Sequence, residues 1–274
     1  MDAARLRDRL RDVIKAPALV PNAPFRSAPV SASDRARRPD DGLVAQTLGG
    51  SWTSCADGRS FVVARRVAAA ARYGRSVIGD LAASLARTAG CAALLGGGAT
   101  RPPFVFFDLE TTGLSGGAGT SAFLVGCGRF DDEGGFVTEQ HLLVEPEGER
   151  SMLQTVAETL GRAGALVSFN GKSFDRPLLE TRYLFHRLEP PCSTLPHVDV
   201  LHPARRFWGN NAGGATLFGQ STCSLLVLER QVLGVRRADD VPGFEIPMRY
   251  FQFVRSGDVR LLTPILEHNR RDLI

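Results

Sequence analysis

Residues 104–120 read FVFFDLETTGLSGGAGT, in which an apolar run turns abruptly into two acids, a threonine pair and several glycines. The apolar residues 104–107 are typical of a central strand that is buried on both faces. Side chains two positions apart share one face of a strand, so Asp108 and Glu110 point the same way at its end. Adjacent carboxylates repel each other, and a divalent cation between them keeps both ionised. The stretch therefore indicates a buried strand that ends in a cation site, with a chance surface pair as the alternative.

Strand signals continue directly after this stretch, at 121–130 and 135–144, with only short connections rich in Gly and Asp. Such spacing predicts an antiparallel meander of three strands. The elements that follow are a helix, a strand, a helix and a short strand, at 150–163, 165–170, 174–187 and 197–201. Helical stretches dominate from 223 to the end. We therefore predict an α/β fold in which a mixed sheet, with three antiparallel strands and then alternating helices and strands, is flanked by helices.

The chain divides into three predicted regions, 1–42, 43–100 and 101–274. The first holds a short amphipathic helix and a linker rich in Pro, Ala, Ser and Arg. The second, a small subdomain or extension, carries one strand and an alanine-rich helix, and the third is the main domain. Its last helix would end two residues after Asp272 without a cap, so we expect the natural protein to continue beyond this point.

Composition excludes several classes of protein. The 274 residues carry a formal charge of +4 that comes almost entirely from arginine. This charge suits a phosphate-bearing partner, but a genome that favours arginine codons explains it equally well. Five scattered cysteines without a C-x-x-C pair argue against a disulfide framework and a zinc ribbon. No run approaches the roughly 18 apolar residues of a membrane span, so we expect a cytoplasmic protein without a membrane partner. Its oligomeric state stays open.

Two later segments add acids to the first pair. Asp175 follows a strand and a turn and lies in the first turn of a predicted helix, where the helix dipole alone would also favour a carboxylate. His268 and Asp272 are four apart on a late helix and share one face, whereas Arg270 and Arg271 point elsewhere. A surface ion-pair arrangement is the alternative for this second group.

Taken in order, D-x-E, N-x-x-x-x-D and H-x-x-x-D resemble the three motifs of the DEDD 3′→5′ exonuclease superfamily on the ribonuclease H-like fold. The similarity is greatest to its YprB-like branch and covers about residues 43–274. The stretches that carry it are DLETTGLSGGAGT, FNGKSFDRPLLETRY, HVDVLHPARRFW, CSLLVLE and HNRRD.

The resemblance implies a two-metal site for phosphodiester hydrolysis. Its four ligands would be Asp108, Glu110, Asp175 and Asp272, holding two Mg²⁺ or Mn²⁺ ions about 4 Å apart. One ion would generate hydroxide and the other would stabilise the leaving oxygen. Oxygen-only donors suit these hard cations better than zinc.

His268 would deprotonate or only position the attacking water. Superfamily members with a histidine in the third motif usually space it five residues from the aspartate, and a spacing of four usually carries tyrosine. The resemblance also implies contacts with the terminal nucleotide by Asn170 and by the residues that follow the first motif. Those residues are Thr111, Thr112, Gly113 and Leu114. An ordinary turn and a helix cap are the alternatives.

Other patterns in the sequence are weaker evidence of function. The run SGGAGTS lacks the G-K-[ST] ending of a phosphate loop, and HVDVLH is expected to be a structural strand rather than a second metal site. Residues 205–208, RRFW, suit single-stranded nucleic acid but equally suit packing. The pairs Arg65–Arg66 and Arg236–Arg237 are expected to lie on solvated faces.

The first functional hypothesis is a metal-dependent 3′→5′ exonuclease, or related nuclease, that acts on single-stranded DNA or RNA ends. The second is a nucleic-acid-binding module on the same fold with little or no cleavage activity. Four converging carboxylates favour the enzyme, because they would repel the phosphates that a pure binder must attract. A phosphodiesterase for small nucleotides is a third, weaker hypothesis. The choice between DNA and RNA stays open.

Overall fold

The computed structural model describes residues 39–91, 100–113, 119–208 and 223–274, all within one compact unit, Ala36–Ile274. The predicted amphipathic helix, most of the predicted linker and Leu114 lie outside the described residues. No helix in the described ranges is long and apolar enough to cross a membrane.

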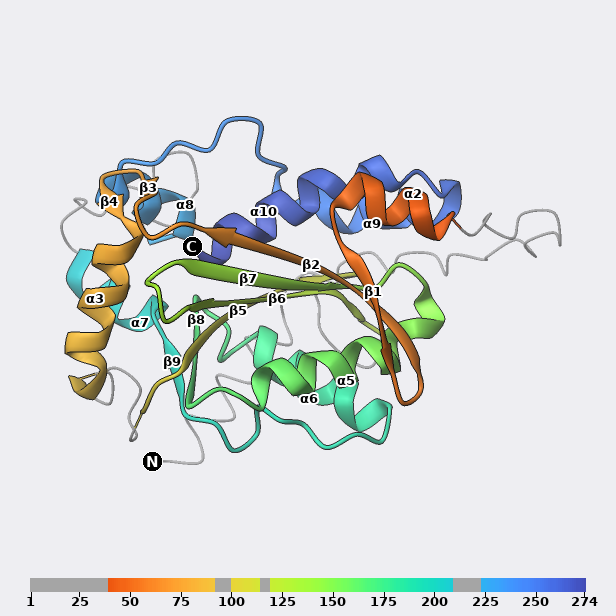
Figure 1. Ribbon diagram of the computed structural model, residues 1–274, viewed down its shortest axis with the longest axis horizontal. Coiled ribbons are helices and arrows are strands. Elements are labelled where there is room, and N and C mark those ends of the chain that lie inside the picture. Colours follow the sequence, from red (N-terminus) through yellow and green to blue (C-terminus); the bar gives the residue numbers. More distant parts are fainter. Residues whose placement is uncertain (1–38, 92–99, 114–118, 209–222) are drawn as a thin grey trace, which may run out of the picture. The chain divides into compact units, whose positions relative to one another are not determined.

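A seven-stranded mixed sheet forms the centre of this unit, in the order β1-β2-β7-β6-β5-β8-β9 (Figure 1). The neighbours from β1 to β5 pair antiparallel, and β5–β8 and β8–β9 pair parallel. The predicted meander is β5-β6-β7, so the predicted α/β fold with its mixed sheet is confirmed. The strands are β1 Ser51–Cys55, β2 Gly58–Val67, β5 Phe104–Thr111, β6 Ala122–Phe130, β7 Phe136–Leu142, β8 Ala165–Ser168 and β9 His197–Asp199, with β3 Arg72–Tyr73 and β4 Ser76–Val77 in a separate hairpin.

Helices cover both faces of the sheet. In Figure 1, α2, α9 and α10 lie along one face and α5 and α6 along the other, in agreement with the contacts of α10 with β5, β6 and β7 and of α5 with β2 and β7. The α-helices are α2 Asp41–Leu48, α3 Ile78–Thr88, α5 Glu149–Leu160, α6 Asp175–Phe185, α7 Leu201–Trp208, α8 Leu225–Leu228, α9 Ile246–Ser256 and α10 Thr263–Leu273. The shorter helical turns are η2 Ala89–Cys91, η3 Pro146–Gly148, η5 Glu229–Leu233 (π-helical), η6 Gly243–Glu245 and η7 Val259–Leu262.

The region expected to be a small subdomain shares the main sheet. Strand β2 pairs with β7 over seven residues, from Phe61 opposite Leu142 to Val67 opposite Phe136. Strands from before residue 101 therefore belong to the main sheet, although the domain boundary itself stays a prediction.

Gly126 of β6 allows α10 to lie against the sheet beside β5. A Cβ atom at this position would be 2.2 Å from Oδ1 of Asn269, far closer than any contact allows. Gly126 is directly opposite Asp108 in the β5–β6 register, and opposite partners on neighbouring strands face the same side of a sheet. Asp108 and Glu110 therefore face α10.

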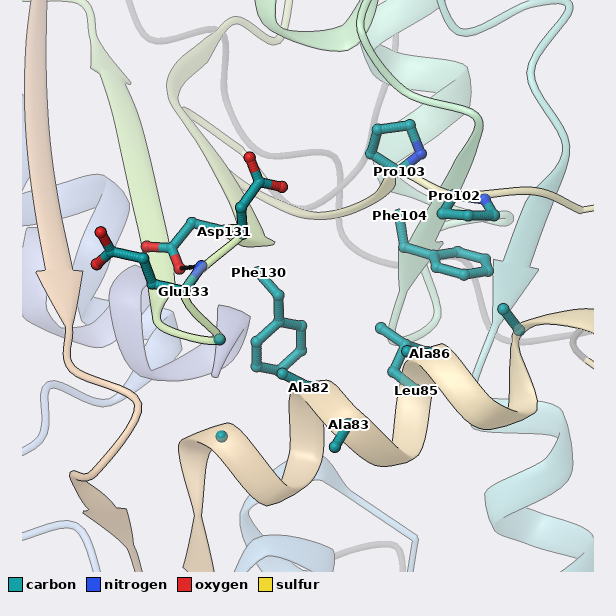
Figure 2. Close-up of a pocket in the computed structure, with 14 residues that line it drawn as sticks. Ala82, Ala83, Leu85, Ala86, Pro102, Pro103, Phe104, Phe130, Asp131 and Glu133 are labelled. Carbon is teal, nitrogen blue, oxygen red and sulfur yellow. Dashed lines mark hydrogen bonds between the residues drawn. The ribbon is translucent and has the colours of Figure 1, made fainter.

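A groove of ≈ 650 Å³ opens at the other end of β5 (Figure 2). Phe104, Phe130 and the small residues of α3 line it, and the acids of the β6–β7 hairpin form one rim. Two of those acids, Asp131 and Glu133, pair with Arg66. Phe104 is four positions from Asp108 along the strand, about 13 Å, and none of the four predicted acids lines this groove.

Candidate metal centre

Three elements bring the four predicted acids together. Asp108 and Glu110 come from the end of β5, Asp175 is the first residue of α6, and Asp272 lies in the last turn of α10. Burial raises the pKa of Asp108 well above its usual range, and the charges of Asp272, Glu110 and Asp175 raise it further. Such mutual effects act over short range, so the four carboxylates lie near one another.

The pKa values of the other acids shift in the same direction. Burial raises the pKa of Glu110 strongly, followed by the charges of Asp272, Asp175 and Asp240. Burial also raises the pKa of Asp175 to about 7, followed by the charges of Asp199 and Asp272. No described residue donates a hydrogen bond to the carboxylate of Glu110 or Asp175 or pairs with it as a cation. These two acids therefore lack any compensating positive charge within the described protein.

Asp108 is held by a buried amide network that the sequence did not reveal. Nδ2 of Asn269 donates to Oδ2 of Asp108 at 2.9 Å, and Nε2 of Gln140 on β7 donates to Oδ1 of Asn269 at 2.8 Å. Both amide side chains are fully buried. The only signal for Asn269 in the sequence is its position next to His268, because a buried amide and an exposed one look alike in a sequence.

The turn that carries Asp175 is shaped by Asp199 of β9. The buried Asp199 carboxylate accepts hydrogen bonds from the backbone N–H of Asn170 at 2.8 Å and of Lys172 at 3.1 Å. Asn170 has a φ of 68°, a left-handed conformation that asparagine tolerates better than most residues. A Cβ at Gly171 would lie 2.9 Å from Oδ2 of Asp175, so this glycine allows the turn to approach the acid.

The sequence favours a structural strand for HVDVLH over a second metal site at His197 and Asp199. His197 instead contacts Ser168, with 2.7 Å between Nε2 and Oγ, and burial lowers the pKa of His197 to about 4. Asp199 accepts the backbone hydrogen bonds just described. His197 and Asp199 therefore serve the structure of the turn.

The threonines after the first motif hold the β5–β6 connection. Thr111 donates its hydroxyl to the carbonyl of Gly113 at 2.8 Å, and Oγ1 of Thr112 accepts from the backbone N–H of Ser121 at 2.9 Å. These contacts favour the turn alternative for both side chains. Contacts of Thr111, Thr112, Gly113 and Asn170 with a nucleotide stay predictions, and Leu114 is outside the described residues.

His268 and Asp272 lie on one face of α10, as their spacing predicts. Nε2 of His268 is 3.6 Å from Oδ2 of Asp272, and Nδ1 is 2.8 Å from Oδ1 of Asp240. Oδ1 of Asp272 lies 2.5 Å from Nη1 of Arg237. Arg270 and Arg271 both turn away and pair with Glu267.

The expectation that Arg237 lies on a solvated face is wrong, since its side chain is 3% exposed. Neighbouring Arg236 is exposed, as expected, and the sequence offers no way to tell the two arginines apart. The tertiary fold buries Arg237 because three carboxylates surround it, those of Glu229, Asp240 and Asp272.

The donor set fits a divalent cation chemically, since it offers carboxylate oxygens with uncompensated charge at one place. Among the described residues, however, no group of three or more His, Cys, Asp or Glu side chains already forms a site that could hold a metal ion. One oxygen of Asp272 is engaged by Arg237. Binding a cation therefore requires side-chain adjustment, for which the unpaired Glu110 and Asp175 carboxylates are free.

Known proteins resemble this chain over most of the predicted main domain. A family model described as RNase_H superfamily (RNase_H_2) matches residues 105–274, which contain all four acids and His268. A Bacillus subtilis (strain 168) protein named "Uncharacterized protein YprB" is 38% identical over 171 residues, 62% of this chain and 39% of that protein. The chain thus spans well under two thirds of this relative's length. With more than half of its residues matched to the family, and with the mixed sheet that its motifs predict, this chain belongs to the RNase H superfamily.

Proposed function

We propose that this chain is a metal-dependent nuclease that hydrolyses single-stranded DNA or RNA from the 3′ end. One observation supports the proposal: four carboxylates from β5, α6 and α10 lie near one another, and two of them, Glu110 and Asp175, have no compensating positive charge among the described residues. Grouped like charges destabilise a folded protein. A function that needs them, the binding of divalent cations, explains why they are together.

The residues of this chain divide the work between holding cations and handling water. Asp108, Glu110, Asp175 and Asp272 would hold two Mg²⁺ or Mn²⁺ ions, which when bound supply an activated water and stabilise the leaving oxygen. Asn269 fixes the orientation of Asp108 through its 2.9 Å hydrogen bond. His268 would orient the attacking water or take its proton, since Asp240 holds Nδ1 and leaves Nε2 on the side of Asp272.

A second candidate is a nucleic-acid-binding module of the same fold with little or no cleavage. The absence of a ready metal site among the described residues and the ion pair of Asp272 with Arg237 favour this alternative. Exposed Phe207 and Trp208 on α7, with rings 6.1 Å apart, offer stacking surfaces for bases under either candidate.

A time course with end-labelled substrates separates the two candidates. Single- and double-stranded DNA and RNA are incubated with Mg²⁺ or Mn²⁺, using the natural chain, Asp108→Asn, and Asp132→Asn as a matched control on the exposed β6–β7 hairpin. We expect the natural chain to shorten the substrate from the 3′ end only when metal is present. The rate should fall at least ~100-fold in Asp108→Asn, which is more than the loss of an outer partner of a metal ligand usually causes. The rate should be unchanged in Asp132→Asn. Binding without cleavage that is insensitive to Asp108→Asn would establish the binding module instead.

A further inference from the structure

Arg237 and Asp240, from the segment between η5 and η6, contact both members of the His268–Asp272 pair. Nη1 of Arg237 lies 2.5 Å from Oδ1 of Asp272, and Oδ1 of Asp240 lies 2.8 Å from Nδ1 of His268. Arg237 and Asp240 also pair with each other at 3.3 Å. One short segment thus supports two side chains of α10 at once.

Each contact engages one atom of its target and leaves the other. Arg237 occupies Oδ1 of Asp272, so Oδ2 is the oxygen left for a cation. Asp240 accepts from Nδ1 of His268, which places the proton of a neutral ring on Nδ1 and leaves the lone pair on Nε2. The two remaining atoms, Oδ2 and Nε2, are 3.6 Å apart. They therefore face the same small volume beside the other acids.

The support is anchored in the protein interior. The side chain of Arg237 is 3% exposed and that of Asp240 is 14% exposed. Nε of Arg237 also pairs with buried Glu229 at 2.7 Å, and Glu229 in turn accepts a hydrogen bond from the hydroxyl of Tyr73. A buried guanidinium with several carboxylate partners has little freedom to move. Arg237 is therefore a fixed point against which Asp272 is held.

We propose that Arg237 and Asp240 are positioning residues for the metal centre, which rests on the proposed function. Arg237 makes Asp272 a one-oxygen ligand through Oδ2, and Asp240 keeps His268 in the Nδ1–H tautomer with Nε2 toward the water that attacks the phosphate. Neither residue touches the substrate or the reacting atoms. The ordinary alternative is that both residues only stabilise the fold.

The test of Arg237 uses Arg237→Lys, which keeps the positive charge but loses the planar fork, with Arg236→Gln as the matched control. Mn²⁺ binding is measured by calorimetry without substrate, and the unfolding temperature is recorded in parallel. We expect the Mn²⁺ dissociation constant of Arg237→Lys to be 10- to 100-fold larger than that of the natural chain, beyond any loss of folded protein. The dissociation constant of Arg236→Gln should be unchanged. Unaltered Mn²⁺ affinity in folded Arg237→Lys would overturn the role of Arg237.

The test of Asp240 uses ¹⁵N NMR of the imidazole rings at a pH where His268 is neutral, with its signals assigned by comparison with His268→Gln. We expect the Nδ1–H tautomer in the natural chain and in Asp240→Asn, whose side-chain oxygen still accepts the hydrogen bond, and its loss in Asp240→Ala. The value of kcat should fall 10- to 100-fold in Asp240→Ala, with KM nearly unchanged and partial rescue in Asp240→Asn. The same tautomer in all three proteins would refute the proposal.

These outcomes are distinguishable from failure of the proposed function. If the natural chain neither binds Mn²⁺ nor cleaves any substrate, the proposed function and the Arg237 role fail together, and the tautomer measurement then reports only a structural contact. If the natural chain binds Mn²⁺ and cleaves while Arg237→Lys and Asp240→Ala behave like Arg236→Gln, the function stands and the positioning roles fail.

Discussion

Acids of the same type lie at or beside the two ends of β5 in opposite electrostatic settings. Beside its first residues, Asp131 and Glu133 pair with Arg66 on the rim of the groove, and hydrogen bonding from Arg66 lowers the pKa of Asp131. At its last residues, burial and neighbouring acids raise the pKa of Asp108 and Glu110. The first group is neutralised by the protein itself. The second group has no such compensation at Glu110 among the described residues, and the cations of the proposed function would supply it.

Substitution of Glu110, at the uncompensated end of β5, should have the largest effect on cleavage. We expect Glu110→Gln to reduce metal-dependent cleavage at least ~100-fold, since a neutral amide is a poor ligand for a hard cation. The same change should raise the unfolding free energy of the metal-free protein by about 1 kcal/mol or more, because it removes one of the repelling charges. Chemical denaturation with and without Mn²⁺ measures both effects. A less stable metal-free variant would contradict this account of the four acids.

The raised pKa of Asp175 makes the stability of the metal-free protein depend on pH. Its folded pKa of about 7 lies above the ordinary value of 3.8, so the folded protein holds this proton more tightly than the unfolded chain does. The stability that this proton provides is complete below about pH 4 and is lost as pH rises through 7. Between pH 5 and pH 8 the metal-free natural chain should therefore lose on the order of 2 kcal/mol relative to Asp175→Asn. Mn²⁺ at pH 8 should restore stability to the natural chain alone. Unfolding free energies are measured against pH for both proteins, and if they change with pH in parallel, the pKa of Asp175 is not raised.

Arg66 tests the neutralised end, where the smallest effect is expected. Exposed ion pairs contribute little to stability, so Arg66→Gln should lower the melting temperature by about 2 °C or less. Cleavage and Mn²⁺ affinity should stay at their natural values, because the ion pairs of Arg66 are with the hairpin acids Asp131 and Glu133, away from the four predicted acids. A large loss of activity in this variant would mean that the two ends of β5 are not independent.

The local parts of the fold were predictable because each depends on short-range patterns. The apolar run of β5, the short connections of the meander and helices α5 and α6 were foreseen, whereas α7 was not. The placement of β2 beside β7 was not, since pairing between strands some 70 residues apart leaves no local pattern.

The candidate site, like the fold, was predictable from the sequence only in part. From the sequence alone, the order and spacing of Asp108, Glu110, Asp175 and Asp272 singled out the acids, because they resemble the three motifs of the exonuclease superfamily. Only the tertiary structure decided which residues support them. Asn269, Arg237 and Asp240 are ordinary polar residues in the sequence, and their roles arise from burial against particular partners. Burial and pairing are properties of how distant segments meet, and that is why the supporting residues stayed hidden until the fold brought those segments together.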